Sequence, residues 1–361
     1  MNSVVENSVL GDRSSGHDTS GVSVSGWRSF PREANRGDST LLSVVVPLYN
    51  EDDVLREFHR RLVGVLDKMS CLSEVIYIND GSTDASLDVL NELQTRDDRI
   101  AVISLSRNFG KEIAVTAGLD YAHGDAAVII DADLQDPPEL ILSLVERWKE
   151  GNDVVYAIRR ERRGETWIKR ATADMFYRVM ENIAETPIPR NAGDFRLMDK
   201  RCIAALSTCR ERRRFMKGLF AWVGFKQVAV TYDRDPRFAG TTKWNYWRLW
   251  NFAIEGITSF TIAPLKLATY FGLLTALASL AYGTFIICRT ALLGRDVPGY
   301  ASIMAVILFL AGAQLIAIGV IGEYVGRIFV ESKSRPLYLV DTCIPSRKIG
   351  KPVEISNQMR G

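Results

Sequence analysis

Residues 126–139 read AAVIIDADLQDPPE, an apolar run that stops at two aspartates. Residues 126–130 have the length and the apolar character of a buried strand, and Asp131 and Asp133 follow directly. Both carboxylates are therefore expected at the carboxyl end of a strand. A plain turn is the alternative interpretation of the same residues, because aspartate is common in turns.

The same succession of strand, polar strand end and helix recurs upstream of this segment. Apolar strands are predicted over residues 42–48, 75–78 and 100–105, and helices over residues 52–69, 84–93 and 111–122. This alternation indicates a parallel, doubly wound, Rossmann-like α/β domain over residues 41–240. Ligands of such sheets bind beyond the carboxyl ends of the strands. The polar residues at those ends are Asn50-Glu51, Asn79-Asp80, Arg107-Asn108 and Asp131 to Asp133.

The chain has 361 residues, of which 47% are apolar, and its formal net charge is +2. This balance gives no overall attraction to nucleic acid, so no nucleic-acid partner is expected. The five cysteines form no CxxC pair and the three histidines have no metal-like spacing, which argues against a disulfide framework or a zinc site. Residues 1–40 are polar and contain no apolar segment, so we expect a disordered tail rather than a signal peptide.

Two uncharged apolar stretches follow the α/β part, at residues 267–288 and 298–322. Each is long enough to cross a bilayer as a helix, and the short link between them predicts a transmembrane hairpin within residues 263–330. Lys and Arg residues precede the first stretch and follow the second. This bias predicts a multi-pass membrane protein with the α/β domain and both termini in the cytoplasm, residues 331–361 being a cytoplasmic tail.

Residues 241–262 place Trp244, Trp247 and Trp250 on one helical stripe. We expect amphipathic helices that lie in the membrane interface with a tryptophan edge. A core-facing helix of the α/β domain is the alternative. Small residues such as Gly312 and Gly319 in the second apolar stretch permit helix–helix association, either in a homo-oligomer or within a single hairpin.

Asp131 and Asp133 are the candidate metal ligands. Carboxylates at positions i and i+2 of a strand end can share one hard cation with a diphosphate. Mg²⁺ or Mn²⁺ held there would neutralise the charge that grows on a departing nucleoside diphosphate. Gln135 is a candidate for a further oxygen ligand.

Asp80 ends the second strand in the run NDGSTD at residues 79–84. Its carboxylate can accept a hydrogen bond from a base N–H or a ribose hydroxyl. Ser82 and Asp84 are expected to cap the following helix, which is the structural interpretation of the same run.

Two basic segments are candidates for binding phosphate. Arg159 and Arg162 follow the strand predicted over residues 154–158, and Arg237 and Lys243 immediately precede the membrane segment. A solvated charged loop is the alternative for the first segment. Contact with the membrane surface is the alternative for the second.

Asp194 and Arg196 flank an aromatic residue in the run GDFRL at residues 193–197. Both are candidate catalytic residues together with Asp133, and Asp194 is expected to orient or deprotonate the acceptor. A structural salt bridge is the alternative.

Several motifs together resemble family-2 glycosyltransferases. They are VVPLYNE at 45–51, NDGSTD at 79–84, SRNFGKE at 106–112, DADLQDPPE at 131–139, GDFRLM at 193–198 and RFAGTTK at 237–243. A narrower similarity, to polyprenyl-phosphate sugar transferases and above all to bacterial bactoprenol glucosyltransferases, rests on MKG at 216–218, WVG at 222–224, EGITSF at 255–260 and GEYVGRIFVESKSRPLY at 322–338. The resemblance covers residues 42–340.

The resemblance implies a GT-A fold and an inverting, metal-dependent transfer of a hexose from a nucleotide sugar, first of all glucose from UDP-glucose, to polyprenyl (undecaprenyl) phosphate. A phosphate acceptor has little need of a strong base, because its second pKa lies near about 6. The implied location is the cell inner (plasma) membrane, and the implied product modifies a cell-surface glycan with the help of a flippase and a downstream glycosyltransferase. By motif position, the implied residues are Pro47, Tyr49, Glu51, Asp80 and Asp131 for the nucleotide sugar, Asp131, Asp133 and Gln135 for the metal, Asp194 for the acceptor, and Arg237 and Lys243 for the phosphates.

Three other functions are compatible with parts of this sequence. A processive polysaccharide synthase of the same fold would carry a QxxRW-type motif and more membrane spans, and the sequence has neither. A non-catalytic membrane scaffold would have no need for the carboxylates. Transfer of another sugar, such as mannose from GDP-mannose or an N-acetylhexosamine, stays open.

Overall fold

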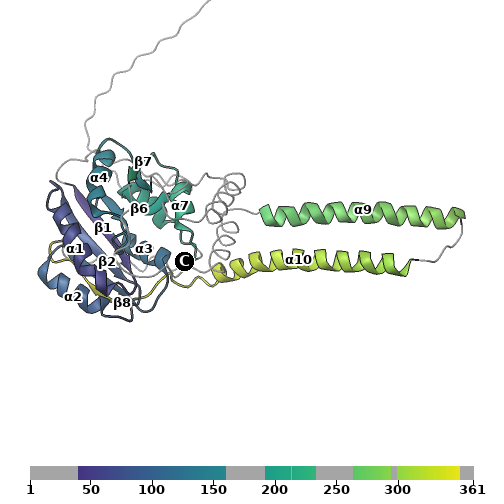
Figure 1. Cartoon of the computed structure of the whole chain (residues 1–361), viewed down its shortest axis with the longest axis horizontal. Helices are drawn as coiled ribbons and strands as arrows, with labels where there is room; N and C mark the ends of the chain where they lie inside the picture. Colours follow the sequence, from purple (N-terminus) through teal and green to yellow (C-terminus); the bar gives the residue numbers. More distant parts are fainter. Residues whose placement is uncertain (1–39, 160–191, 213, 233–262, 294–298, 350–361) are drawn as a thin grey trace, which may run out of the picture.

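The computed structural model describes residues 40–159, 192–212, 214–232, 263–293 and 299–349. Figure 1 shows an α/β domain from which two long helices extend side by side. The predicted interfacial segment 241–262 and all of the predicted N-terminal tail except Thr40 lie outside the described residues.

The α/β domain alternates strands and helices along the chain. Its first half contains β1 (Leu41–Leu48), α1 (Asp52–Leu66), β2 (Leu72–Asn79), α2 (Ser86–Arg96), β3 (Ile100–Leu105), α3 (Lys111–Asp120) and β4 (Ala126–Ile129). Its second half contains the short 3₁₀ helix η1 (Pro138–Leu140), α4 (Ile141–Lys149), β5 (Val154–Arg159), β6 (Ala192–Asp199), α6 (Lys200–Ser207), α7 (Met216–Trp222) and β7 (Gln227–Tyr232). The elements predicted upstream of Asp131 are all present, with ends shifted by a few residues.

The strands form one mixed sheet in the order β7-β5-β6-β4-β1-β2-β3-β8, in which β8 (Val340–Ile344) comes from the C-terminal segment. β4, β1, β2 and β3 are parallel, as predicted. The expectation of a wholly parallel sheet is wrong, because β6 runs antiparallel to β4 and β5, and β8 antiparallel to β3. The sequence of β6 hides the strand, since Asp194 and Arg196 interrupt its apolar residues.

Helices cover both faces of the sheet. Val44 and Val46 of β1 belong to a buried cluster that includes Phe58 of α1, whereas Val45 belongs to a cluster that includes Ala117 of α3. This division follows from the alternation of side chains along a strand. Because both faces of β1 are covered, the strand is apolar throughout, as its sequence indicated.

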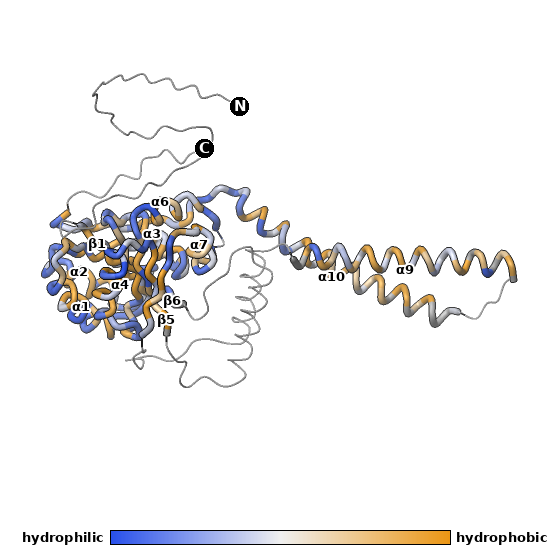
Figure 2. The backbone as a smooth tube through the Cα atoms, turned by 90° about the horizontal axis from the view of Figure 1, so that it is seen from above, coloured by the Kyte–Doolittle hydropathy of each residue, from blue (hydrophilic) through white to orange (hydrophobic). Residues whose placement is uncertain are grey.

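Two long apolar helices, α9 (Ala263–Leu293) and α10 (Tyr300–Ser332), form a hairpin outside the domain core. The stretches long and apolar enough to span a membrane are Leu265–Ile286 and Phe309–Ser332, and neither is buried within the molecule. Figure 2 shows hydrophobic residues along both helices. The first stretch agrees with the prediction. The second extends beyond the predicted end at Gly322, because the helix continues past Glu323 to Ser332.

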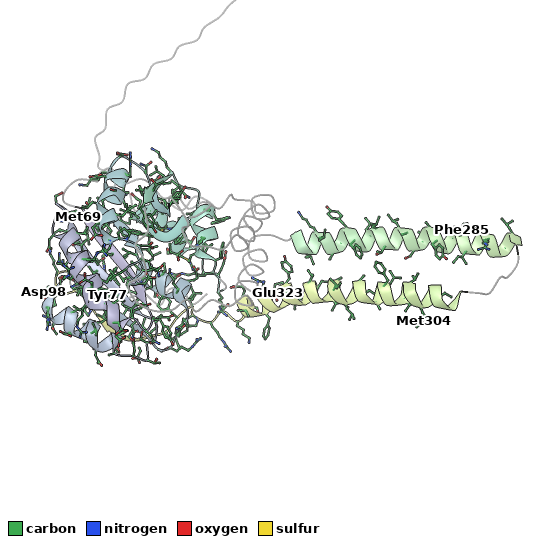
Figure 3. All side chains as sticks on the ribbon, viewed as in Figure 1. Met69, Tyr77, Asp98, Phe285, Met304 and Glu323 are labelled. Carbon is green, nitrogen blue, oxygen red and sulfur yellow. The ribbon has the colours of Figure 1, made fainter. Side chains whose placement is uncertain are left out.

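The two ends of the hairpin differ in their distance from the domain. Figure 3 places Glu323 close to the domain, and Phe285 and Met304 toward the far end of the two helices. At the domain end, the side chain of Glu323 accepts a hydrogen bond of 3.1 Å from Arg327 one turn further on. Phe271 of α9 and Phe309 of α10 pack against each other between the two helices, with their ring centroids 6.4 Å apart.

The prediction that residues 331–361 form a tail is corrected by β8. Val102 and Leu105 of β3 pair with Ile344 and Val340 of this strand. Just before β8, the carbonyl of Leu339 accepts a hydrogen bond of 2.9 Å from the N–H of Ser106. The segment after α10 therefore runs back along the domain and covers the edge of the sheet.

A second set of contacts holds the base of the hairpin. The N–H of Arg212 donates to the carboxylate of Glu331 at 2.8 Å, and its guanidinium donates to the carbonyl of Val330 at 2.6 Å. Asp120, at the end of α3, accepts hydrogen bonds from Arg210 at 2.7 Å and from Tyr338 at 2.9 Å. The C-terminal end of α10 is thus tied to the domain by both polar contacts and strand pairing.

Gly118 marks the closest approach of α3 to the sheet. A Cβ atom at this position would lie 2.3 Å from Cγ1 of Val45 and 2.6 Å from Cδ1 of Ile78. We expect Gly118→Ala to destabilise the domain by about 1–3 kcal/mol through overpacking, measured as a lower melting temperature of the detergent-solubilised chain. Gly64→Ala in α1 is the matched control, because no atom lies within 4 Å of its added Cβ. A melting temperature for Gly118→Ala as high as that of the control would contradict this packing.

Candidate active site

The loops that follow β1 and β2 are joined by hydrogen bonds between side chains and backbone. The N–H of Asn50 donates to the hydroxyl of Ser82 at 3.0 Å, and the N–H of Thr83 donates to Oδ1 of Asn50 at 2.8 Å. Asn50 has a φ of 55°, a left-handed conformation that asparagine adopts more readily than most residues. Ser82 therefore ties the loops together instead of capping α2 as expected. Asp84 accepts the N–H of Ser86 at the start of that helix.

The residues predicted for the nucleotide pocket at the end of β1 differ in accessibility. Pro47 is buried within β1, opposite Ile78. Tyr49 exposes 40% of its surface immediately beyond the strand, and Glu51 is half-buried. Tyr49 and Glu51 are therefore open to a ligand, whereas Pro47 shapes the strand end from within.

Asp80 holds the loop that follows β3. It is 3% exposed, and its two oxygens accept the N–H groups of Phe109 at 2.7 Å and Gly110 at 2.8 Å. Burial raises the pKa of Asp80, although these two donors oppose the rise. The neighbouring Gly81 has a φ of 65°, and a Cβ there would lie 2.4 Å from the carbonyl carbon of Arg107. The predicted contact of Asp80 with a nucleotide stays a prediction, because both oxygens already accept hydrogen bonds.

The DADLQ run (residues 131–135) begins just beyond β4, as predicted. Burial raises the pKa of Asp131, and the nearby carboxylate of Asp194 adds to that rise, while Lys111 opposes it. Asp133 accepts the N–H of Gln135 at 3.1 Å. Gln135 itself is only 8% exposed, so its role as a metal ligand also stays a prediction.

Lys111 joins two of the predicted site residues. Its Nζ lies 2.6 Å from Oδ2 of Asp131 and 2.7 Å from Oδ2 of Asp194. The two aspartates meet because β6 runs antiparallel to β4 with Arg196 opposite Ile129, which places residue 194 across from residue 131. Lys111 was not among the predicted site residues. The only signal for it was its position in the SRNFGKE motif, at the polar end of β3.

Asp194 is strongly biased toward its ionised form. Burial alone would raise the pKa of Asp194, but Lys111, Lys217 and Arg196 together hold it well below its usual range. Within the described residues, Oδ1 of this carboxylate is buried and has no hydrogen-bond partner. Asp194 is therefore a fixed negative charge at neutral pH.

Arg196 lies beneath Asp194 on the same face of β6. It is 3% exposed, and its guanidinium carbon is 3.7 Å from the centroid of the Phe220 ring. Burial lowers the pKa of Arg196 to about 10, and the charge of Asp194 opposes this shift. Arg196 can therefore support Asp194 from within the domain, whereas Lys111 and the two aspartates lie on the accessible side.

Glu112 is a half-buried acid that the sequence did not single out. It follows Lys111 on α3, and its carboxylate accepts the N–H of Met216 at 3.0 Å. Burial raises the pKa of Glu112 to about 7, and Asp194 adds to the rise. This contact joins the start of α3 to the start of α7.

Most of the predicted phosphate-binding residues lie outside the described part of the chain. Arg162, Arg237 and Lys243 fall in that category. Arg159 ends β5, where its backbone pairs with Tyr232 of β7, so it lies at a strand end as predicted. The phosphate-binding role of all four arginine and lysine residues stays a prediction.

Comparison with known proteins identifies both parts of the chain. Residues 43–206 match the glycosyl transferase family 2 domain, and residues 263–328 match the GtrB C-terminal hairpin. An uncharacterised glycosyltransferase of Synechocystis sp. is 57% identical over 299 residues, which cover 83% of this chain and 94% of the relative. The bactoprenol glucosyl transferase of Shigella phage SfV is 45% identical over 299 residues, which cover 83% and 97%.

The chain belongs to glycosyltransferase family 2. This membership confirms the resemblance drawn from the motifs, the enzyme class and the GT-A fold with its C-terminal helical hairpin. The matched hairpin and the two apolar helices also associate the enzyme with a membrane.

The end of β4 suits a divalent cation shared with a ligand of this glycosyltransferase. Among the described residues, no three His, Cys, Asp or Glu side chains are grouped so as to hold a metal ion by themselves. Asp131 and Asp133 nevertheless offer the hard oxygen ligands that Mg²⁺ and Mn²⁺ prefer, and a diphosphate would supply the rest. Asp131 contacts Lys111 through one oxygen, Oδ2, and its side chain is 28% exposed, so it can be reached by an ion. The residues present therefore fit such an ion.

Removal of the charge of Asp80 is expected to weaken the attachment of the loop after β3 in this glycosyltransferase. In Asp80→Asn, an NH₂ group faces one of the two backbone N–H donors, which costs about 1–3 kcal/mol for an unsatisfied buried group. We expect a lower melting temperature and a raised KM for the sugar donor. Asp88→Asn, at an exposed carboxylate of α2, is the matched control. Wild-type KM and stability in Asp80→Asn would show that the loop after β3 does not depend on this carboxylate.

Proposed function

We propose that this enzyme transfers a hexose, most simply glucose from UDP-glucose, to polyprenyl phosphate with inversion at the anomeric carbon. The lipid acceptor would be undecaprenyl phosphate, and the product a lipid-linked sugar for modifying a cell-surface glycan. The observation that carries this proposal is the pairing, in one chain, of a carboxylate cluster at the strand ends with an apolar hairpin tied to the same domain. The name of the Shigella phage relative, a bactoprenol glucosyl transferase, supports the same sugar and lipid.

The chain's own residues divide the work between binding and electrostatics. Tyr49 and Glu51, open at the end of β1, would contact the nucleotide of the donor. Asp194 would orient the acceptor, as a fixed charge opposite Asp131. A phosphate oxygen of the lipid attacks the anomeric carbon as the bond to the nucleoside diphosphate breaks. No proton has to leave the acceptor, because its phosphate monoester is mostly dianionic near about pH 7.

The leaving nucleoside diphosphate requires added positive charge. A Mg²⁺ or Mn²⁺ ion held by Asp131 and Asp133, with Gln135 as a further ligand, would supply electrostatic stabilisation of the diphosphate. Arg159, Arg162, Arg237 and Lys243 are proposed to bind the phosphates of donor and acceptor from the other side. Lipid and donor then meet in a fixed orientation, which lowers the entropic part of the barrier.

The proposed orientation in the membrane rests on the distribution of Lys and Arg along the sequence. We propose that the α/β domain and both ends of the chain lie in the cytoplasm, and that both hairpin helices cross the inner (plasma) membrane. The polar base of the hairpin, with Glu323, Arg327 and Lys333, lies at the domain end. Residues 241–262 are proposed as interfacial helices. A homo-oligomer, a flippase and a downstream glycosyltransferase are further proposed partners.

A donor screen tests the proposal directly. Purified full-length chain in detergent is given undecaprenyl phosphate, Mg²⁺ or Mn²⁺, and one radiolabelled nucleotide sugar at a time, and label in the lipid extract is counted. We expect label from UDP-glucose that disappears with EDTA. Label only from GDP-mannose or from a UDP-N-acetylhexosamine would retain the reaction and replace the sugar. Absence of lipid label from every donor would overturn the proposal in favour of a non-catalytic scaffold.

A further inference from the structure

Lys111 occupies a position that helix stability does not explain. It is the first residue of α3, after Gly110. The N-terminus of a helix carries partial positive charge, so acidic side chains are favoured there and a lysine is disfavoured. The lysine is nevertheless held in place, because Asp80 binds the N–H groups of Phe109 and Gly110 directly before it. The position of the Lys111 ammonium group is therefore fixed by the surrounding structure and not by helix stability.

The ammonium of Lys111 bridges two strands that run in opposite directions. Asp131 follows β4 and Asp194 lies on β6, and each offers Oδ2 to the same nitrogen at 2.6 and 2.7 Å. Without the ammonium group between them, the two carboxylates would repel each other. The lysine side chain is 42% exposed, and the carboxylates are 28% and 23% exposed, so the bridge faces the open side of the site.

We propose that Lys111 is a resident cation of the metal site, which holds Asp131 and Asp194 together between turnovers and is exchanged for the metal ion at Asp131. The inference rests on the metal ion of the proposed function and assigns a role to a residue that the motifs alone did not single out. Lysine suits this role because its charge is compact and its four-carbon stem is flexible, whereas arginine would favour a rigid two-bond contact with one carboxylate. On exchange, Lys111 keeps its contact with Asp194.

The exchange links metal binding to the arrival of the donor. A free metal ion must compete with an ammonium group that is already in contact with Asp131, so its affinity in the absence of nucleotide is low. A diphosphate adds oxygen ligands and negative charge, which shift the competition toward the metal ion. Lys111 would thus hold Asp131 and Asp194 in place without a permanently bound metal ion.

The test measures Mn²⁺ binding to the full-length chain in detergent by the electron paramagnetic resonance signal of the free ion, with and without UDP. Without nucleotide, Lys111→Met is expected to bind Mn²⁺ at least about tenfold more tightly than the wild type, because a like charge a few ångströms away is gone. Lys111→Arg is the matched control. It keeps a positive charge a few ångströms from Asp131 even if the guanidinium contacts only one carboxylate, so it should not show this gain in affinity. Asp131→Asn is expected to lose the site. If Lys111→Met does not fold, Lys111→Gln replaces it.

The outcomes separate this inference from the function on which it rests. Binding to Lys111→Met that is equal to or weaker than that of the wild type overturns the exchange. If, in the same experiment, the wild type binds Mn²⁺ with UDP and Asp131→Asn does not, the metal site of the proposed function still stands. Absence of Asp131-dependent binding in every variant overturns both. A second readout is thermal melting in EDTA, where Lys111→Met should melt below the wild type and Mn²⁺ should restore it.

Discussion

Replacement of Asp131 and Asp133 together by asparagine is expected to lower sugar transfer by at least about a thousandfold, a loss of about 4 kcal/mol of transition-state stabilisation. The reason is electrostatic. Charge grows on the diphosphate as its bond to the sugar breaks, and two neutral amides hold a divalent cation far less tightly than two carboxylates do. The measurement is the initial rate of lipid-linked label at saturating donor and metal ion.

The same double variant is expected to fold normally. Because the pKa of Asp131 is raised in the folded chain, its charge disfavours the native state at neutral pH, and a neutral amide removes that cost. Lys111 retains its second partner, Asp194. The melting temperature should therefore stay within about 4 °C of the wild type. Asp53→Asn with Asp88→Asn, at two exposed carboxylates of α1 and α2, is the matched control for loss of negative charge. Transfer at the wild-type rate in Asp131→Asn with Asp133→Asn would remove these carboxylates from the mechanism.

The part of the fold that sequence patterns predict is the part whose strands are buried on both faces. β1 to β4 are short apolar runs followed by polar residues, and each was found within a few residues of its observed limits. β6 and β8 were missed for opposite reasons. β6 carries Asp194 and Arg196 on the face that builds the site, so its apolar pattern is interrupted. β8 covers the edge of the sheet and is only half-buried, so its sequence resembles that of a tail.

The candidate site was predictable where one residue type has a recognisable position, and not where it depends on pairing between distant strands. Asp131 and Asp133 could be predicted because they directly follow an apolar run of strand length. The contact of Lys111 with both aspartates depends on the antiparallel register of β6 on β4, which brings Asp194 across from Asp131. No local pattern around Lys111 encodes that register. Asp80 has a structural role that its position did not indicate, because this carboxylate, which is predicted to contact a ligand, holds the loop after β3.

Asp194→Asn is expected to lower kcat by about a hundredfold or more without moving the pH dependence of the rate, because an orienting charge of this kind contributes on the scale of a positioned acid or base. The expectation about pH follows from the sign of the pKa shift. Lys111, Lys217 and Arg196 outweigh burial and depress the pKa of Asp194. A depressed carboxylate pKa stabilises the folded chain above its unfolded value of about 3.9, and this stability is lost only as the pH falls through the folded pKa. Asp194 therefore keeps its charge throughout the range from about pH 5 to 8.

Any acidic limb of the rate in that range must belong to another group. Glu112 has a pKa of about 7, but its carboxylate accepts the N–H of Met216 and has no contact with substrate in the proposed function. The lipid phosphate, with a second pKa of about 6, is therefore the expected group. kcat measured between about pH 5 and 8 at saturating substrates should thus rise through the same midpoint in the wild type and in Asp194→Asn, with only the plateau lowered. If Asp194 instead took a proton from the acceptor with a pKa that lay within this range in the substrate complex, the limb would report its titration and would vanish in the variant. The position of the limb, more than the size of the loss, therefore decides whether Asp194 acts as a base or as a fixed charge that orients the acceptor.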